Sequence, residues 1–162
     1  MNAFAGIHAV YNHGNQPCLH TSWLFNFSGR PDLTQTWVRA ICNEFYGTDG
    51  VHGYGYGQDE DQGQLGAWYV MSSIGLFDVK GLTAENPSFQ VGSPLFDRVE
   101  IQLHPTYYPG KTFVIETKNN SIENIYNRNI RLNNKPLKSV FVPFNTLKKG
   151  GKLTITMSDK PE

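Results

Sequence analysis

Three consecutive acidic residues at the end of a glycine-rich stretch form the densest group of chemically active side chains in this sequence. Residues 50–64, GVHGYGYGQDEDQGQ, place four glycines ahead of Asp59, Glu60 and Asp61. Adjacent carboxylates repel one another. Such a cluster is therefore expected where it binds a cation, lies at a helix N-terminus or supplies a carboxylate for general base catalysis. The structural alternative is that Asp59 or Asp61 caps the helix that follows.

A second polar segment, residues 12–20, reads NHGNQPCLH. Its candidate ligands are Asn15, Gln16, His13, Cys18 and His20. The two amide side chains offer carbonyl oxygens and N–H donors, which suit sugar hydroxyls or a hard cation. The thiol and the two imidazoles match no common zinc spacing, and a histidine near a helix start is more often part of hydrogen-bonded structure. The segment therefore favours a sugar or a hard cation over zinc.

The elements that position these segments are predicted to be helices. Asp32 followed by Gln35 resembles a capping box, and Gly47 supplies a stop. The apolar residues at every fourth position between them are Leu33, Trp37, Ile41 and Phe45. This spacing predicts an amphipathic helix with these four residues on its buried face.

Other helices are predicted around this one. Residues 62–76 are apolar almost all round, which predicts a helix buried on several sides. Shorter helices are expected over residues 2–11 and 19–28, the second ending at Gly29. The helical positions of the three tryptophans predict that they pack in the core, and the two cysteines are expected to be free buried thiols.

The second half of the chain changes to strand periodicity. Apolar and polar residues alternate over 99–104 and 153–158, and further strands are expected over 113–116 and 125–132. We predict an antiparallel sheet. The fold class is then α+β, with a helical region at 1–78 and a β-rich region at 79–162.

Composition restricts the kind of ligand. Fourteen Lys and Arg balance fourteen Asp and Glu, so the formal net charge is zero and no basic footprint favours nucleic acid. No apolar run is long enough to span a bilayer. A neutral partner is expected, and the chain itself does not indicate its cellular location.

Several motifs in one order resemble a known family. They are HGNQP, LFNFSGRP, DEDQGQLGAWYVMSSIGLFDV, FQVGSPLF and TFVIETKNNSIENIY. Together they resemble the C-terminal part of glycoside hydrolase family 92, the calcium-dependent exo-acting α-mannosidases. The resemblance implies that this chain holds the last helices of an (α/α)6 catalytic barrel, followed by closing β structure.

The resemblance also implies roles for individual residues. Asp61 matches the carboxylate assigned as general base and Asp59 its partner, while Gln58 stands where the family usually has glycine. The GNQP motif implies Asn15 and Gln16 as substrate contacts and as calcium ligands, and the matching His20 that follows it is a further substrate contact. No residue matches the family's general acid.

The function implied is that of an inverting exo-α-mannosidase removing mannose from glycans, with α-1,2 linkages as substrate. The chain is expected to be a C-terminal fragment that is inactive alone and associates with itself or with the missing N-terminal remainder. Alternatives are a non-catalytic carbohydrate-binding or structural fragment, and one half of a split enzyme. The family resemblance suggests a secreted, periplasmic or cell-surface protein.

Overall fold

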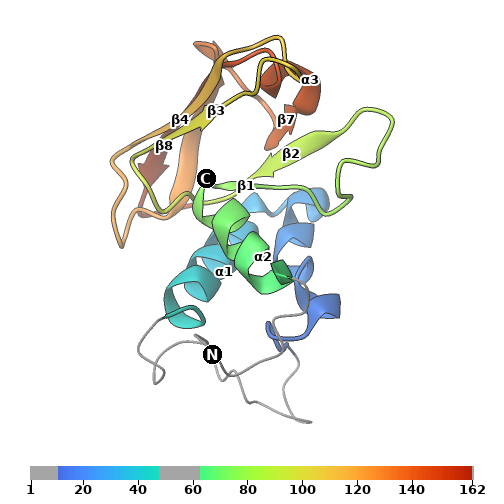
Figure 1. Cartoon of the computed structure of the whole chain (residues 1–162). Helices are drawn as coiled ribbons and strands as arrows, with labels where there is room; N and C mark the ends of the chain where they lie inside the picture. Colours follow the sequence, from blue (N-terminus) through green and yellow to red (C-terminus); the bar gives the residue numbers. More distant parts are fainter. Residues whose placement is uncertain (1–10, 48–62, 162) are drawn as a thin grey trace.

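Helices and strands separate into two layers in the computed structural model, which describes residues 11–47 and 63–161 (Figure 1). In chain order the elements are η1 (Gln16–Cys18), η2 (Thr21–Ser28), α1 (Pro31–Glu44), α2 (Gln64–Ser73), β1 (Leu76–Phe77), β2 (Ser88–Val91), β3 (Arg98–Gln102), β4 (Thr112–Lys118), β5 (Tyr126–Leu132), β6 (Lys135–Pro136), β7 (Phe141–Pro143), α3 (Phe144–Leu147) and β8 (Gly151–Ser158). The expected mixture of helix and sheet is confirmed, whereas the division at residue 78 stays a prediction.

The N-terminus of α1 is built differently from the predicted capping box. Pro31 occupies the first turn, where its missing N–H costs nothing, and no side chain caps the helix. The Asp32 carboxylate instead accepts two hydrogen bonds from Arg30, at 2.9 and 2.7 Å. The Gln35 side-chain oxygen accepts from the backbone N–H of Asn127 on β5, at 3.0 Å. The capping box is therefore wrong, because both side chains have partners outside the helix end.

The buried face of α1 is also rotated from the predicted stripe. Ile41 and Phe45 are buried as expected, but Leu33 is only half-buried and Trp37 is 47% exposed. The buried positions within the helix are Thr34, Gln35, Val38, Arg39, Ile41 and Cys42. Gln35 and Arg39 are buried here because this face meets the β layer and they form hydrogen bonds with it.

Arg39 makes the principal polar connection between the two layers. Its Nε donates to the Ser93 hydroxyl at 3.0 Å, and its Nη2 donates to the Pro94 carbonyl at 2.6 Å and to the Asn120 side-chain oxygen at 2.9 Å. Burial lowers the pKa of Arg39 from its usual value. The three acceptors replace the water that the guanidinium loses on burial.

The segment before α1 forms η2, a 3-10 helix, at the predicted place. It ends at Gly29, as predicted, and this residue has a φ of +77°, a conformation that glycine adopts without strain. Trp23 of η2 is fully buried and stacks on Phe77 at 5.2 Å between ring centroids. Gly92 is required beside it, since a Cβ there would lie 2.5 Å from the Trp23 ring.

One face of α2 is exposed, in contrast to the predicted burial on several sides. Leu65 and Trp68 are buried, whereas Ala67 is exposed and Val70 is 58% exposed. Nothing in the described part of the chain covers this apolar face. Trp23 and Trp68 are thus core residues as predicted, but Trp37 is not.

The strands form two sheets. The first has the order β1-β2-β7 and the second β3-β4-β8-β5-β6. All four predicted strands are confirmed within the second sheet, but the prediction of an antiparallel sheet is wrong at its centre, where β4 and β8 are parallel. A parallel pair needs a crossover connection, and the chain provides it through β5, β6, β7 and α3.

Alternation along β4 and β8 fills the core of the β layer. Phe113, Ile115, Leu153, Ile155 and Met157 are at most 2% exposed and face one another in a single cluster. A separate cluster lies in the helical layer. Each layer therefore has its own apolar core.

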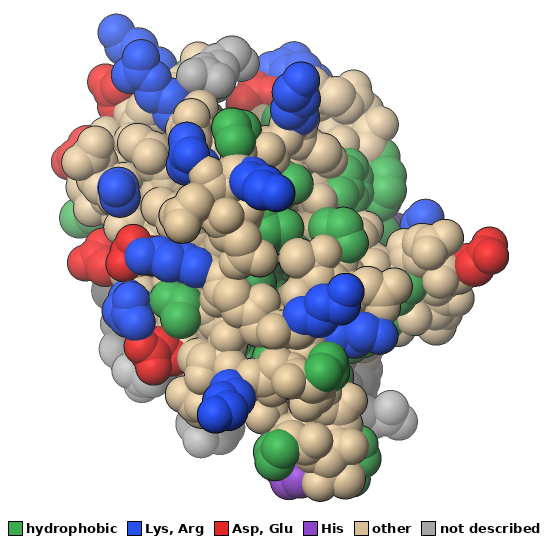
Figure 2. Space-filling view, turned by 90° about the horizontal axis from the view of Figure 1, so that it is seen from above, with side chains coloured by type: hydrophobic (Ala, Val, Ile, Leu, Met, Phe, Trp, Pro, Cys, Tyr) green, Lys and Arg blue, Asp and Glu red, His purple; other side chains and the backbone are tan. Residues whose placement is uncertain are grey.

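Cys42 is buried and Cys18 half-buried, both are free, and burial raises the pKa of the Cys42 thiol to about 12. No helix in the described ranges is long and apolar enough to cross a membrane. Viewed onto the β layer, the surface shows Lys and Arg side chains scattered rather than gathered in one patch (Figure 2).

Candidate functional site

A hollow of about 340 Å³ opens in the helical layer, where the chain before η2, the helix α2 and the turn after β1 meet. Its lining residues are Gln16, Leu19, His20, Gln64, Ala67, Trp68, Met71, Phe77, Asp78, Val79 and Gly81. Apolar and aromatic side chains make most of the wall, and a few polar groups converge on it. This combination and volume are typical of a small-molecule site.

The structure brings some of the predicted site residues together and leaves others apart. Gln16 and His20 both line the hollow, with Gln16 half-buried and His20 exposed. Asn15 is exposed and is not part of the lining; it is the residue before η1, and its side chain makes no capping bond. Asp59 and Asp61 lie outside the described residues, so their predicted roles stay predictions.

Gln64 connects the hollow to the acidic segment of the sequence. It is the first residue of α2 and lines the hollow, and in sequence it follows Asp61 by three positions. Gly63 before it has a φ of +76°, which glycine adopts without strain. The turn into α2 thus presents the last residue of the DEDQGQ motif to the hollow.

Trp68 forms a fixed part of the wall. Its indole Nε1 donates to the Leu19 carbonyl at 2.8 Å, which ties α2 to the segment before η2. Its ring stacks on Tyr46 at 5.9 Å and meets the edge of His13 at 4.3 Å between centroids. A ligand in the hollow would therefore meet an aromatic surface that is already held in place.

His13 supports this wall from behind. It is 1% exposed, and its Nδ1 and Nε2 each lie 2.8 Å from a tyrosine hydroxyl, of Tyr11 and Tyr46 respectively. The Tyr46 hydroxyl donates to the Leu65 carbonyl at 3.0 Å, so it accepts from His13 and the Nε2 atom carries the proton. Nδ1 then accepts from Tyr11. The structural role predicted for a histidine at this place is confirmed.

The electrostatics of His13 agree with this hydrogen-bond pattern. Burial lowers its pKa from 6.5 to about 4, so the ring is neutral at neutral pH. A neutral ring has one donor and one acceptor nitrogen, as the two tyrosines require. Among the residues that the structure describes, no group of three or more His, Cys, Asp or Glu side chains could hold a metal ion.

Asp78 is a lining residue that the sequence did not single out. Its carboxylate accepts from the backbone N–H groups of Lys80 at 3.0 Å and Leu82 at 2.7 Å, which closes the turn that forms one side of the hollow. Leu82 has a φ of +60° in this turn. An aspartate that hydrogen-bonds to the backbone two residues on is a recognisable turn signal, but its place in the wall of the hollow depends on the tertiary fold.

This chain is similar to known proteins over nearly its whole length. The model of the glycosyl hydrolase family 92 catalytic domain matches residues 2–159. A family GH92 alpha-mannosidase from Bacteroides thetaiotaomicron superposes with a TM-score of 0.81 at 30% identity, covering 94% of this chain and 19% of that one. A family GH92 inverting mannosidase from Bacteroides thetaiotaomicron VPI-5482 gives a TM-score of 0.77 at 35% identity, covering 92% and 19%.

A relative from another organism gives a similar coverage. An uncharacterized secreted glycosidase of Arthroderma benhamiae is 29% identical over 150 residues, which are 89% of this chain and 18% of that protein. The chain thus spans about a fifth of the length of the relatives it matches. The motif resemblance is confirmed: this chain belongs to glycosyl hydrolase family 92, within the catalytic domain of that family.

Proposed function

We propose that this chain is the part of an inverting exo-α-mannosidase that carries the general base, acting on glycans with terminal α-1,2-linked mannose. The observation that carries the proposal is the hollow, where Gln16, His20 and Gln64 from two family motifs converge on an aromatic wall. The two bacterial neighbours are an alpha-mannosidase and an inverting mannosidase, which supports an α-mannoside substrate and inversion at the anomeric carbon. The formal net charge of zero suits a neutral glycan.

Asp61 is proposed as the general base. In an inverting glycosidase the base deprotonates a water molecule that attacks the anomeric carbon, and the acid on the other side protonates the leaving oxygen. The two carboxyl groups lie about 6.5 to 9.5 Å apart, which leaves room for the water. Asp61 precedes Gln64 of the hollow by three residues, and Asp59 supports it from the same segment. The acid has no counterpart in this chain and would come from the rest of the catalytic domain.

Asn15 and Gln16 are proposed to hold calcium, with His20 contacting a sugar hydroxyl. The donor chemistry fits, because amide carbonyls are hard oxygen ligands and the Asn15 side chain makes no capping bond in η1. Calcium bound there would orient neighbouring mannose hydroxyls and favour the oxocarbenium-like transition state. Gln16 lies in the hollow, where such a contact is needed.

The product's anomeric configuration tests the reaction. The complete protein, given a methyl or aryl α-mannoside, is expected to release β-mannose first, as followed by proton NMR before mutarotation. A matched α-glucoside should be left unchanged. Release of α-mannose would contradict the inverting mechanism, and no hydrolysis of any α-mannoside would contradict the function.

The calcium site is tested separately. Exhaustive chelation of the complete protein is expected to remove mannosidase activity, with calcium and not zinc restoring it. Asn15→Ala should raise the calcium concentration needed for half-maximal recovery. Full activity after chelation and dialysis would refute the metal.

The remainder of the enzyme is proposed to cover the helical layer. In the described residues, Leu24, Trp37 and Val70 are all more than 40% exposed there. These exposed apolar side chains support packing against further helices of an (α/α)6 barrel. The relative that is named as a secreted glycosidase supports a secreted protein. The exposed face supports a 162-residue segment that, when isolated, is inactive and self-associates. Sedimentation velocity should show a mass above 18.3 kDa, which Val70→Glu reduces.

A further inference from the structure

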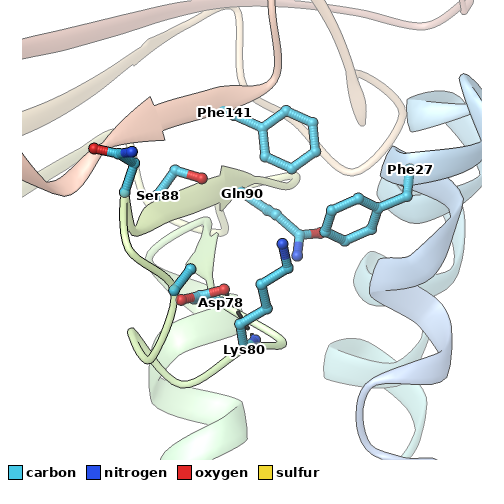
Figure 3. A pocket seen from close by; sticks show the side chains of 8 residues that line it. Phe27, Asp78, Lys80, Ser88, Gln90 and Phe141 are labelled. Carbon is cyan, nitrogen blue, oxygen red and sulfur yellow. Dashed lines mark hydrogen bonds between the residues drawn. The ribbon is translucent and has the colours of Figure 1, made fainter.

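A second, smaller cavity lies between the helical layer and the three-stranded sheet. It is lined by Phe27 of η2, Gln90 and Ser88 of β2, Phe141 of β7, and the turn that includes Asp78 and Lys80 (Figure 3). Its free volume of about 30 Å³ has room for one water molecule or one hydroxyl group. Because Asp78 lines both spaces, this cavity adjoins the larger hollow.

Gln90 presents an unsatisfied donor to this cavity. The residue is 1% exposed, and its side-chain oxygen accepts from the Asn26 amide at 3.1 Å. Its Nε2 atom has no hydrogen-bond partner among the described residues. Figure 3 shows the carboxamide reaching from β2 toward the Phe27 ring. A buried amide donor without an acceptor costs free energy, so an acceptor that occupies the cavity is favoured.

The neighbouring charges determine what kind of acceptor fits. The ammonium of Lys80 lies 5.8 Å from the centre of the Phe27 ring and joins no ion pair within the described ranges. The carboxylate of Asp78 is bound to backbone N–H groups but retains free lone pairs. An anion would be repelled by Asp78 and a cation by Lys80. A neutral hydroxyl accepts from Gln90 and can still donate to an oxygen of Asp78 or Ser88.

The rim of the cavity offers an apolar surface beside these polar groups. Phe27 is 49% exposed, and its ring lies 5.1 Å from that of Phe141. Convergent polar groups next to exposed aromatic rings form a pattern that fixes an amphipathic ligand in one orientation. A sugar has this character, with hydroxyls at its edge and C–H groups on its faces.

We propose that this cavity binds one hydroxyl group of the mannose-containing glycan, with the sugar ring resting against Phe27. The inference depends on the proposed function, because that function supplies the carbohydrate. It adds Gln90, Lys80 and Phe27 as binding residues to a surface outside the hollow. Gln90 would donate to the hydroxyl, and Asp78 or Ser88 would accept from it.

Side-chain amide resonances of the ¹⁵N-labelled 162-residue chain, carrying Val70→Glu to reduce its self-association, test the proposal. Methyl α-D-mannopyranoside is expected to shift the Gln90 NH₂ pair saturably, while the permethylated sugar, which lacks hydroxyl protons, should bind at least tenfold more weakly. Phe27→Ala should weaken the shift at least tenfold. Phe96→Ala removes a ring of the same 49% exposure elsewhere and should leave it unchanged.

Other outcomes would overturn the proposal. A Gln90 resonance that does not move, or that moves equally with the permethylated sugar, would show that the cavity holds water only. Lys80→Met keeps the length of the side chain without its charge and should also weaken binding. This second variant keeps the proposal testable if Phe27→Ala fails to fold. The proposed function fails on a different measurement, the hydrolysis of α-mannosides by the complete protein.

Discussion

The helical layer and the β layer differ in the side chains that cover their outer surfaces. On the β layer, Glu116 pairs with Lys152 at 2.6 Å and with Arg98 at 3.4 Å, so charged side chains of three adjacent strands cover the exposed face. On the helical layer, Val70 and Trp37 expose apolar surface. The β layer also exposes Phe96, Tyr107 and Ile122, but these residues lie in turns between strands, so the charged pairs still cover the strand face. The helical layer carries the hollow and an uncovered face, as expected of the part that completes a larger site.

The largest expected difference between the two layers comes from matched core deletions. Trp68→Ala and Phe113→Ala each remove a buried ring and should each lower the free energy of unfolding by about 3 to 5 kcal/mol. Only Trp68→Ala should also lower kcat/KM of the complete protein on an α-mannoside. The fall in kcat/KM should exceed the fall in the fraction of folded protein. Chemical denaturation and steady-state kinetics measure the two effects. Equal loss of activity in both variants would contradict the assignment of function to the helical layer.

The helical layer is expected to lose stability in acid because of His13. The pKa of His13 is about 4 in the folded chain and near 6.5 when unfolded, so the unfolded chain binds more protons between these values. His13 therefore contributes stability above pH 6.5 that is lost as the pH falls toward 4, by about 3 kcal/mol in all. Urea titrations at several pH values measure this loss.

A matched pair of variants isolates the source of that pH dependence. His13→Gln should remove the fall in the free energy of unfolding between pH 6.5 and 4 that His13 causes. His104→Gln, in the β layer, should retain it. An unchanged slope in His13→Gln would show that the acid sensitivity arises elsewhere.

The connection between the layers gives a smaller effect. Arg39→Met should lower the free energy of unfolding by about 1 to 3 kcal/mol, because the Pro94 carbonyl and the Asn120 side chain lose a charged donor. Asn120→Ala alone should cost less, and the double variant should cost less than the sum. Additive losses would contradict a direct coupling through this hydrogen bond. Denaturant titrations of the parent, the two single variants and the double variant measure the four free energies of unfolding.

The strands were the most predictable part of the fold. Val99 and Ile101, and likewise Leu153 and Ile155, alternate with polar residues, and a period of two is specific to strands with one buried face. The parallel pairing of β4 and β8 could not be read in this way, because alternation identifies a strand but not its neighbour. Register depends on contacts between residues far apart in the sequence.

The helical region was less predictable because its buried residues are partly polar. Gln35 and Arg39 lie outside the predicted apolar stripe, but they are buried where they meet a donor and acceptors of the β layer. Trp37 looked like a core residue, yet no described part of the chain covers it. In the candidate site, the amide chemistry of Gln16 was visible in sequence, whereas its meeting with Asp78 across the hollow required the fold.

One substitution tests the proposed role of Asp61 as general base. In the complete protein, Asp61→Asn is expected to reduce kcat on an α-mannoside by about 10² to 10⁴-fold, because the attacking water loses its proton acceptor. Glu60→Gln serves as the neighbouring control, and thermal unfolding of both variants should match that of the parent protein. A kcat for Asp61→Asn close to that of the parent would contradict the account.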